Sequence, residues 1–428
     1  MPMSSALLTD HYELTMLQAA LESGAAGRSA VFEVFARHLP AGRRYGVVAG
    51  TGRVLDAIED FRFGDAELAF LRGHQVVNER TLDFLASYRF SGDVLGYREG
   101  ECYFPGSPIM VVRGAFAEAV LLETVILSIL NHDSAIAMAA SRMVHAAGSR
   151  PIIEMGSRRT HEQAAVASAR AAYLAGFSST SNLMAGSRYG VPTAGTSAHA
   201  FTLLHGSEYE AFQAQIDSLG PGTTLLVDTY DVAKAVRTAV ELAGPALGAV
   251  RIDSGDLDVA AHEVRRMLDS LGATGTRIVV TSDLDEFAIA ALASAPVDGY
   301  GVGTSVATGS GAPTAAMVYK LVARDEGDGV LAPVAKKSVG KPSKGGQKAA
   351  FRAVEDGVAT AELVTTVPGE AAPEGARTLL RELVRGGEIV GREPLAAARE
   401  RHRASMAELP SSAHQLSQGD PAIPTVFS

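Results

Sequence analysis

The chain has 428 residues and a formal net charge of -10; 47% of its residues are hydrophobic and 20% are charged. It is too long for one average domain but fits a barrel with an accessory domain, and its apolar content suffices for a large core. The acidic balance argues against a general nucleic-acid binder, which needs a basic surface. The lone cysteine, Cys102, excludes an internal disulfide framework and a cysteine-based zinc site.

The sequence shows no secretory signal pattern, and no apolar run approaches the ~18 residues needed to span a bilayer. We therefore expect a soluble, cytoplasmic protein that binds neither membrane nor nucleic acid.

Residues 1–117 are expected to form a mixed α/β domain. Thr9 or Asp10 can cap a first helix that Gly24 can end. The run 30–37 is rich in β-branched and aromatic residues and predicts a strand. Three short helical patterns follow, and then a small sheet is expected between residues 91 and 116.

Residues 118–322 have a regular rhythm. A long helical pattern from Glu118 to Ala147 leads into short apolar runs that alternate with helical patterns; the runs are 152–153, 224–227, 249–252, 278–280 and 297–302. Alternating units of this kind predict parallel strands with helices outside them. Polar residues or glycine follow most runs, and active sites in barrels collect at the carboxyl ends of the strands. These turns are therefore expected to face one mouth.

Beyond residue 322 the pattern loosens. A basic, Gly-rich loop spans 336–348, and a helical pattern covers 396–409. The loop has two interpretations: a solvated surface loop, or a segment that closes over an anionic substrate.

The turn from Asp253 to Asp256 follows one predicted strand and opens a helix. Its carboxylates can hold Mg²⁺ or ribose hydroxyls, and Gly255 lets backbone approach a ligand. The alternative is a simple helix cap made by Ser254 or Asp256. Arg251 shares the face of Asp253 on an extended strand, which favours a site.

Two later turns combine glycine with hydroxyl groups, as phosphate-binding loops do. They contain Ser282, Asp283, Gly303 and Thr304. The alternative is a pair of ordinary connecting loops.

His199 lies among small residues that leave its imidazole room to meet a ligand, so it is a candidate nucleophile or acid/base; the alternative is a structural histidine. Arg158 and Arg159 form a donor pair suited to carboxylate or phosphate. The alternative is a surface ion pair with Glu154 or Glu162.

Eight segments together resemble the nicotinate phosphoribosyltransferase family, in the family's order: TDHYELTM, FEVFARHLP, EMGSRRTHE, GTSAHAF, VDTYDV, VRIDSGDL, TSDLDE and GVGT. The resemblance implies a type II phosphoribosyltransferase fold of α/β class: an irregular, incomplete α/β barrel with a mixed α+β N-terminal domain, completed by C-terminal segments. Residues 323–428 are then expected to pack back on the N-terminal domain. It also implies a homodimer with shared active sites.

The resemblance further implies that nicotinate and phosphoribosyl pyrophosphate react to nicotinate mononucleotide and pyrophosphate, with ATP hydrolysis through a phosphohistidine at His199. It assigns Arg251 and Asp253 to catalysis, and Asp228 and Asp253 to Mg²⁺. The implied nicotinate-binding residues are Tyr12 (from the neighbouring subunit), Arg158 and Ser181. The implied phosphoribosyl and phosphate residues are Asp228, Gly255, Ser282, Asp283, Gly303 and Thr304.

Three other functions remain open. A nicotinamide-using relative carries an aspartate where this chain has Ser181, and that carboxylate would repel nicotinate. A quinolinate-using relative needs a more basic pocket and no histidine. The third is a non-catalytic, nucleotide-binding relative.

Overall fold

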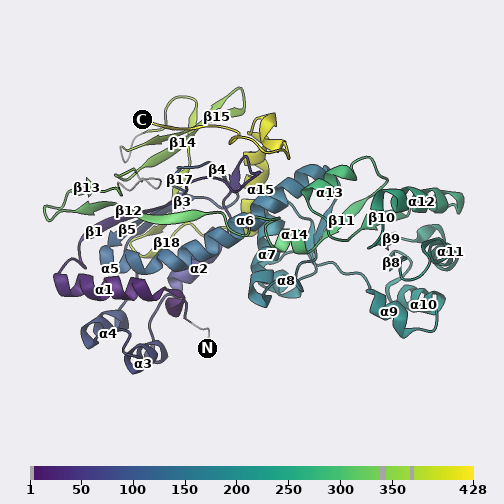
Figure 1. The fold of residues 1–428 in the computed structure, drawn as a ribbon, viewed down its shortest axis with the longest axis horizontal. Coiled ribbons are helices and arrows are strands. Elements are labelled where there is room, and N and C mark those ends of the chain that lie inside the picture. The colour runs from purple at the N-terminus through teal and green to yellow at the C-terminus, as the bar shows by residue number, and fades with distance from the viewer. Residues whose placement is uncertain (1–3, 337–343, 367–370) are drawn as a thin grey trace. The chain divides into compact units, whose positions relative to one another are not determined.

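The computed structural model describes residues 4–336, 344–366 and 371–428, and the chain divides into two compact units (Figure 1). The first unit comprises residues 1–138 and 312–428, and the second comprises 139–311. These boundaries differ from the expected 117/118 and 322/323. The first difference arises because the long helix α6 (Glu123–Ala147) contains the boundary and its periodicity does not change there.

The central sheet of the first unit is antiparallel and joins strands from both ends of the chain. Its order is β13-β12-β1-β5-β3-β17-β18. The strands are β1 (Ser29–Ala36), β3 (Asp93–Tyr97), β5 (Met110–Ala115), β12 (Met317–Asp325), β13 (Leu331–Pro333), β17 (Leu380–Arg385) and β18 (Glu388–Ile389). Two smaller sheets accompany it, made of β16 (Ala376–Thr378), β14 (Ala349–Glu355), β15 (Val358–Thr365) and β19 (Thr425–Phe427), and of β2 (Gly46–Val47) and β4 (Cys102–Tyr103).

The helices of the first unit agree with the sequence pattern within a few residues. The first, α1 (His11–Ser23), follows Asp10 and ends at Gly24, whose φ of 78° is left-handed. The others are α2 (Thr51–Glu59), α3 (Asp65–Gly73), α4 (Glu79–Ala86), α5 (Phe116–Ala119) and α15 (Leu395–Ala407), with 3-10 turns η1 (Ala6–Leu8), η2 (Val120–Leu122) and η4 (Ser411–His414).

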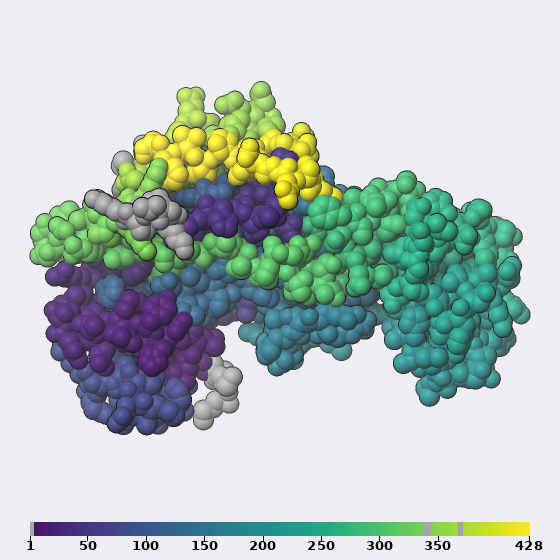
Figure 2. All heavy atoms as spheres, viewed as in Figure 1, coloured from purple at the N-terminus to yellow at the C-terminus, as the bar shows by residue number. Residues whose placement is uncertain are grey.

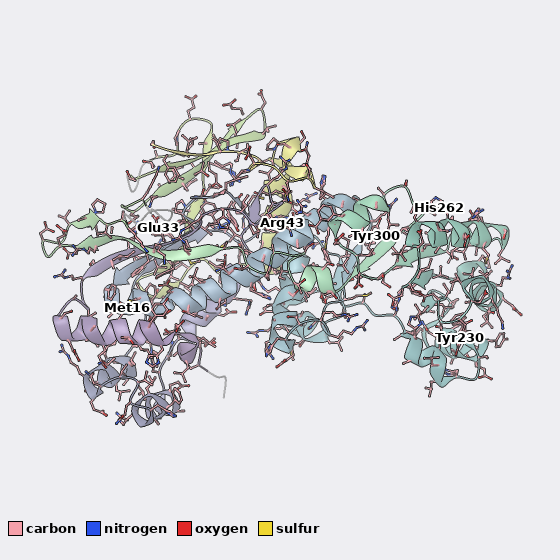
Figure 3. All side chains as sticks on the ribbon, viewed as in Figure 1. Met16, Glu33, Arg43, Tyr230, His262 and Tyr300 are labelled. Atoms are coloured by element: carbon pink, nitrogen blue, oxygen red, sulfur yellow. The ribbon has the colours of Figure 1, made fainter. Side chains whose placement is uncertain are left out.

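The C-terminal residues, yellow in Figure 2, lie against N-terminal residues of the same unit. The Cys102 amide donates to the Ser405 hydroxyl at 3.0 Å. Near the basic loop, the buried Lys348 ammonium lies 2.6 Å from a carboxylate oxygen of Glu33, which Figure 3 labels on β1. Residues 337–343 of the predicted loop 336–348 lie outside the described residues.

The second unit is built on a six-stranded parallel sheet with the order β7-β6-β11-β10-β9-β8. Its strands are β6 (Ile152–Glu154), β7 (Ser179–Thr180), β8 (Thr224–Leu226), β9 (Ala249–Ile252), β10 (Arg277–Val280) and β11 (Gly299–Val302). A closed barrel of this type has eight strands. Because β7 and β8 are edge strands here, the expected irregular, incomplete α/β barrel is confirmed.

Helices connect the strands of this sheet in the predicted alternation (Figure 1). They are α7 (Glu162–Leu174), α8 (Leu183–Tyr189), α9 (His199–Leu204), α10 (Glu208–Leu219), α11 (Val232–Ala243), α12 (Leu257–Ser270), α13 (Glu286–Ala291) and α14 (Thr304–Ala307), with the 3-10 turn η3 (Gly244–Ala246).

One continuous helical stretch, 116–147, is long and apolar enough to cross a membrane by length and composition alone. In its most apolar window 67% of the residues are buried within the protein, as in a core helix of a soluble protein. It is the stretch that the sequence predicted as a long helix.

Candidate active site

Polar and glycine residues follow the carboxyl ends of the six parallel strands of the second unit. Tyr300, labelled on β11 in Figure 3, is fully buried, whereas the turn that follows β11 is partly open to solvent. Parallel strands end at the same edge of a sheet, so residues far apart in sequence come together there. Two cavities lie among these residues.

The first cavity has a volume of about 300 Å³. It brings together five of the predicted site residues, Arg158, Ser181, His199, Arg251 and Asp253. The rest of its lining is Met155, Ser157, the segment 194–198 and Thr281. Guanidinium groups, an imidazole, a carboxylate and hydroxyls therefore face one space that is large enough for a small ring.

The second cavity has a volume of about 240 Å³ and contains the predicted phosphate-loop residues Ser282, Asp283, Gly303 and Thr304. Arg159 and Gly301 also line it. It shares Met155, Arg158, Asp253 and Thr281 with the first cavity. A ligand with two parts can therefore occupy both cavities while contacting the shared residues.

The turn after β11 is tight, which explains its glycines. A Cβ atom on Gly303 would lie 3.2 Å from the Met155 carbonyl oxygen, and one on Gly301 would lie 2.5 Å from Thr281 Cγ2. Ser282, in the neighbouring turn, has a φ of 142°, which is rare for a residue with a side chain. Backbone strain of this kind clusters at functional sites.

Asp228 does not line the first cavity but contacts Asp253, which does. Its Oδ2 accepts hydrogen bonds from the Asp253 amide at 2.8 Å and from the Ser254 hydroxyl at 2.7 Å. Its Oδ1 is buried and accepts no hydrogen bond from the described residues. Asp253 Oδ1 in turn accepts a hydrogen bond from the Thr281 hydroxyl. The two carboxylates are thus held together, and one buried oxygen is left unsatisfied.

The helix-cap alternative for this turn applies to Asp256, which accepts a hydrogen bond from the Val259 amide at 3.3 Å. Asp253 itself lines both cavities. The turn therefore serves as a cap at one end and contributes to the site at the other. Gly255 has a φ of 81° and lines neither cavity.

His199 begins helix α9, and its side chain is 39% exposed. Its Nδ1 lies 3.1 Å from the Thr229 hydroxyl. Its Nε2 lies 3.8 Å from Asp228 Oδ1 and 3.9 Å from Asp253 Oδ2. One ring nitrogen is therefore fixed by a hydroxyl, and the other faces the carboxylate pair at a distance longer than a hydrogen bond.

Arg251 reaches the first cavity from β9 and donates a hydrogen bond to the Thr196 hydroxyl. Burial lowers the pKa of its guanidinium, while Asp253 and Asp228 oppose that shift. Its Nε is buried and makes no hydrogen bond within the described residues. Arg251 is therefore a partly desolvated cation with donor capacity left over.

Glu154 shapes the loop that carries Arg158. Its carboxylate accepts hydrogen bonds from the Gly156 amide and the Thr180 hydroxyl, and its backbone oxygen accepts one from the Ser181 amide at 2.8 Å. Burial raises the pKa of this carboxyl group. Glu154 therefore ties the loop after β6 to the end of β7.

The expected alternative, an ion pair between the two arginines and Glu154 or Glu162, is wrong within the described chain. Arg158 and Arg159 form no ion pair there, since Glu154 is engaged by loop groups and Glu162 lies near His161. Both guanidinium groups line cavities instead.

Tyr12 lies in the first unit, on α1, and is 43% exposed. Burial, with Glu123 and Glu13 nearby, raises the pKa of its phenol well above the usual value. Its ring is therefore neutral, partly exposed and free to present an aromatic face.

Three threonine hydroxyls support the site: Thr281, which belongs to a turn predicted from the sequence to bind phosphate, and Thr196 and Thr229, which were missed. Each fixes a predicted site residue by a hydrogen bond. Thr229 follows strand β8 within a few residues, so a rule that counts hydroxyls at strand ends would have found it. Thr196 lies in a loop and gives no such signal.

Comparison with known proteins identifies the family. Residues 7–131 match the family described as the nicotinate phosphoribosyltransferase N-terminal domain. A nicotinate phosphoribosyltransferase of Mycobacterium tuberculosis is 59% identical over 431 residues, which cover 98% of this chain and 94% of that protein.

Two solved structures share the fold over almost the whole chain. Human nicotinic acid phosphoribosyltransferase gives a TM-score of 0.83 at 25% identity, with 98% of this chain and 97% of that chain covered. A nicotinate-nucleotide pyrophosphorylase from Pyrococcus furiosus gives 0.78 at 26% identity, with 94% and 95% covered. The chain belongs to the nicotinate phosphoribosyltransferase family.

Proposed function

We propose that the protein transfers the phosphoribosyl group of phosphoribosyl pyrophosphate to the ring nitrogen of nicotinate, which forms nicotinate mononucleotide and pyrophosphate. The observation that carries this proposal is the pair of cavities that share Arg158 and Asp253. One offers arginines and a histidine around a ring-sized space, and the other offers glycine and hydroxyl turns. The relatives' names support the same reaction.

In this proposal the first cavity holds the pyridine ring. Arg158 and Arg251 bind its carboxylate, because a guanidinium matches a carboxylate through paired hydrogen bonds. Ser181 lines the same cavity and brings no negative charge that would repel an acid. Tyr12 of a second subunit stacks on the ring face.

The second cavity holds the ribose phosphate, with backbone amides and hydroxyls of the turns 282–283 and 303–304 as donors. The sugar becomes positive as pyrophosphate leaves, so the Asp253 carboxylate nearby stabilises that charge. The nucleophile is the ring nitrogen, which needs correct orientation more than a strong base.

Asp228 and Asp253 have the donor set that suits Mg²⁺. Magnesium in enzymes is commonly held by one or two carboxylates together with substrate phosphates. The unsatisfied, buried Oδ1 of Asp228 and the nearby Oδ2 of Asp253 fit that arrangement. When bound, the ion neutralises charge on the leaving pyrophosphate.

We also propose that ATP phosphorylates His199 and that its hydrolysis is coupled to the transfer. His199 is 39% exposed beside the first cavity, and one of its nitrogens is fixed by Thr229. A phosphate on this ring changes the charge facing Asp228 and Asp253, which can alter the order of the site loops.

Substrate choice provides the test. In Arg158→Gln, the ratio of kcat/KM for nicotinate to that for nicotinamide should fall about 10- to 100-fold, because a charge-assisted pair with the carboxylate is lost. Arg159→Gln is the control, since Arg159 lines only the phosphate cavity and should leave the ratio unchanged. Faster turnover of nicotinamide than nicotinate by the unmodified protein would contradict the proposal.

A homodimer with shared sites is proposed as well. Large apolar side chains on α8 and α9 are exposed beside the site: Leu183 by 75%, Met184 by 60%, Leu203 by 61% and Leu204 by 80%. Each helix thus presents two adjacent exposed apolar side chains, which a second subunit would cover in this proposal. We assign the dimer to the cytoplasm, where the substrates are soluble metabolites.

Mixing two inactive variants tests the sharing. If Tyr12 completes the partner's site, Tyr12→Ala and His199→Ala chains should regain roughly one quarter of full activity on subunit exchange, because half of the dimers then hold one intact site. No recovery in a mixture shown to contain mixed dimers would contradict shared sites.

A further inference from the structure

The first unit contains a cavity of about 250 Å³ that the proposed reaction does not use. It shares no residue with the two cavities of the second unit. Four arginines line it, from β16, β17, α15 and the end of β3. The lining is Arg98, Glu101, Arg377, Thr378, Leu379, Arg381, Arg401, Ala404, Ser405 and Glu408.

Two of the arginines are satisfied by acidic partners. Arg377 donates to Glu101 through Nη1 and Nη2, both at 2.8 Å, and to Glu408 at 2.7 and 3.1 Å. Arg401 donates to Glu393 at 2.5 and 2.7 Å and to the Glu99 carbonyl at 2.7 Å. These ion pairs hold Arg377 and Arg401 in place, and most of their guanidinium donors are already hydrogen-bonded.

The other two arginines, Arg98 and Arg381, have no such partner. Both side chains are exposed, and neither guanidinium forms an ion pair or hydrogen bond with any of the described residues. Arg381 lies opposite Gly96 in the antiparallel pairing of β17 with β3. Arg98 directly follows the end of β3, two residues beyond Gly96, and its side chain lines the same cavity as Arg381. Two unpaired guanidinium groups therefore line one small cavity.

The lining has a formal charge of +2, from four arginines and two glutamates. The neighbouring positive charges of the arginines repel each other. An anion bound between them would offset this repulsion and accept charge-assisted hydrogen bonds from both guanidinium groups. Each guanidinium offers a planar fork that matches the oxygens of a phosphate. We propose that this cavity binds a small, phosphate-bearing anion, held between Arg98 and Arg381.

The size of the cavity narrows the class of ligand. Sites for drug-sized ligands have volumes of about 300–1,000 Å³. At about 250 Å³ this cavity suits inorganic phosphate or the phosphate end of a small phosphomonoester, not a dinucleotide. Arg98 and Arg381, whose guanidinium groups are unpaired, supply the two positive charges that match a phosphate dianion.

The test is calorimetric titration of inorganic phosphate into the full-length protein and its variants. The double variant Arg98→Gln/Arg381→Gln should lose one class of phosphate sites, with affinity lowered about tenfold or more. Arg381→Lys should weaken this class less, since it keeps the charge and loses the fork. The matched control is Arg385→Gln on the same strand, where Arg385 pairs with Glu382 and does not line the cavity.

Three outcomes would overturn the proposal. An unchanged isotherm for the double variant would show that phosphate does not bind in this cavity. An equal loss of phosphate affinity in Arg385→Gln would show that the surface attracts phosphate diffusely instead. Tighter binding of succinate than of phosphate at this class rejects the phosphate chemistry. Thermal melting without phosphate distinguishes anion binding from a structural role of the two arginines. If they only repel each other, the double variant should be at least as stable as the parent. If they support the fold, its Tm should be lower.

Discussion

Two buried carboxylates, one in each unit, differ in how many of their oxygen atoms are engaged. Glu362 on β15 is fully buried; its Oε1 accepts a hydrogen bond from Arg352 Nη2 at 2.5 Å, and its Oε2 accepts one from the Ser107 hydroxyl. The side chain of Asp228 is 3% exposed, and its Oδ2 accepts two hydrogen bonds. Its Oδ1 accepts none from the described residues.

An unsatisfied buried oxygen costs free energy that a saturated one does not, so each arrangement indicates a role. Glu362 has every partner it needs within its own unit and can only support the fold. Asp228 has one oxygen that accepts no hydrogen bond from the described residues, and this oxygen lies 3.8 Å from Nε2 of His199, which lines the first cavity. Of these two carboxylates, the saturated one belongs to a buried ion pair, whereas the partly satisfied one lies close to the histidine that lines a cavity.

The largest expected effect is a loss of stability when the ion pair of Glu362 is broken. At pH 8, above the pKa of Glu362, Arg352→Met removes the buried cation beside this carboxylate, and we expect the free energy of unfolding to fall by about 3–5 kcal/mol, since Glu362 is left buried without its charge partner. Urea unfolding measures the loss. Turnover per folded molecule should stay within about twofold of the parent if Arg352 acts only on the fold.

The control is Arg385→Met, which removes an exposed guanidinium paired with Glu382 and should lower the free energy of unfolding far less than Arg352→Met does, because water screens an exposed pair. A loss for Arg352→Met no larger than this would show that the buried pair contributes little.

On the site side, Asp228→Asn should lower kcat about 100- to 1,000-fold. The amide oxygen can still accept from the Asp253 amide and the Ser254 hydroxyl, so the fold should persist, whereas the free carboxylate oxygen is lost. Steady-state assays and thermal melting together separate the two effects.

Asp231→Asn is the matched control, because Asp231 caps α11 through the Lys234 amide at 2.8 Å and asparagine caps equally well. A large loss of stability in Asp228→Asn, with kcat per folded molecule retained, would place Asp228 among the structural carboxylates.

The pH dependence of stability gives a smaller effect. Burial raises the pKa of the Glu362 carboxyl to about 7, against the opposing influence of Arg352. Its folded pKa thus lies above the unfolded value, so between about pH 4.5 and pH 7 the folded state holds a proton that the unfolded state has lost. This group therefore contributes stability at low pH that is lost as pH rises through that window.

The matching variant is Glu362→Gln, which cannot titrate. Relative to it, the parent should lose roughly 1–3 kcal/mol between pH 5 and pH 8. Urea midpoints at several pH values provide the comparison. Parallel curves for the two proteins would mean that Glu362 stays charged throughout and that Arg352 outweighs its burial.

The sequence predicted the second unit well because its strands and helices alternate regularly. Five apolar runs became β6, β8, β9, β10 and β11, and residues at their ends line the cavities. The C-terminal strands of the first unit were missed. The hairpin of β14 and β15 carries a usable signal, Asp356-Gly357, with φ values of 50° and 79° that such turns require.

The features of the site that could not be predicted from the sequence depend mostly on contacts between residues far apart in the chain. Arg251 and Thr196 are separated by 55 positions, and no local sequence pattern at either residue predicts their contact. The freedom of Arg158 is equally invisible in sequence, since it depends on Glu154 being engaged elsewhere. Local periodicity predicts which residues share an edge, whereas tertiary contacts decide which of their atoms stay available.

The smallest expected effect concerns the hydroxyl that holds His199. Thr229→Val keeps the size of the side chain and removes the partner of Nδ1, so the ring loses one fixed nitrogen. We expect ATP hydrolysis to fall about 3- to 10-fold, the value of one ordinary hydrogen bond, while the KM for nicotinate changes little. Thr229→Ser retains the hydroxyl and should restore the rate. If both variants lose the same activity, packing of the methyl group matters and the hydrogen bond does not; if neither loses any, the orientation of His199 depends on Asp228 and Asp253 instead.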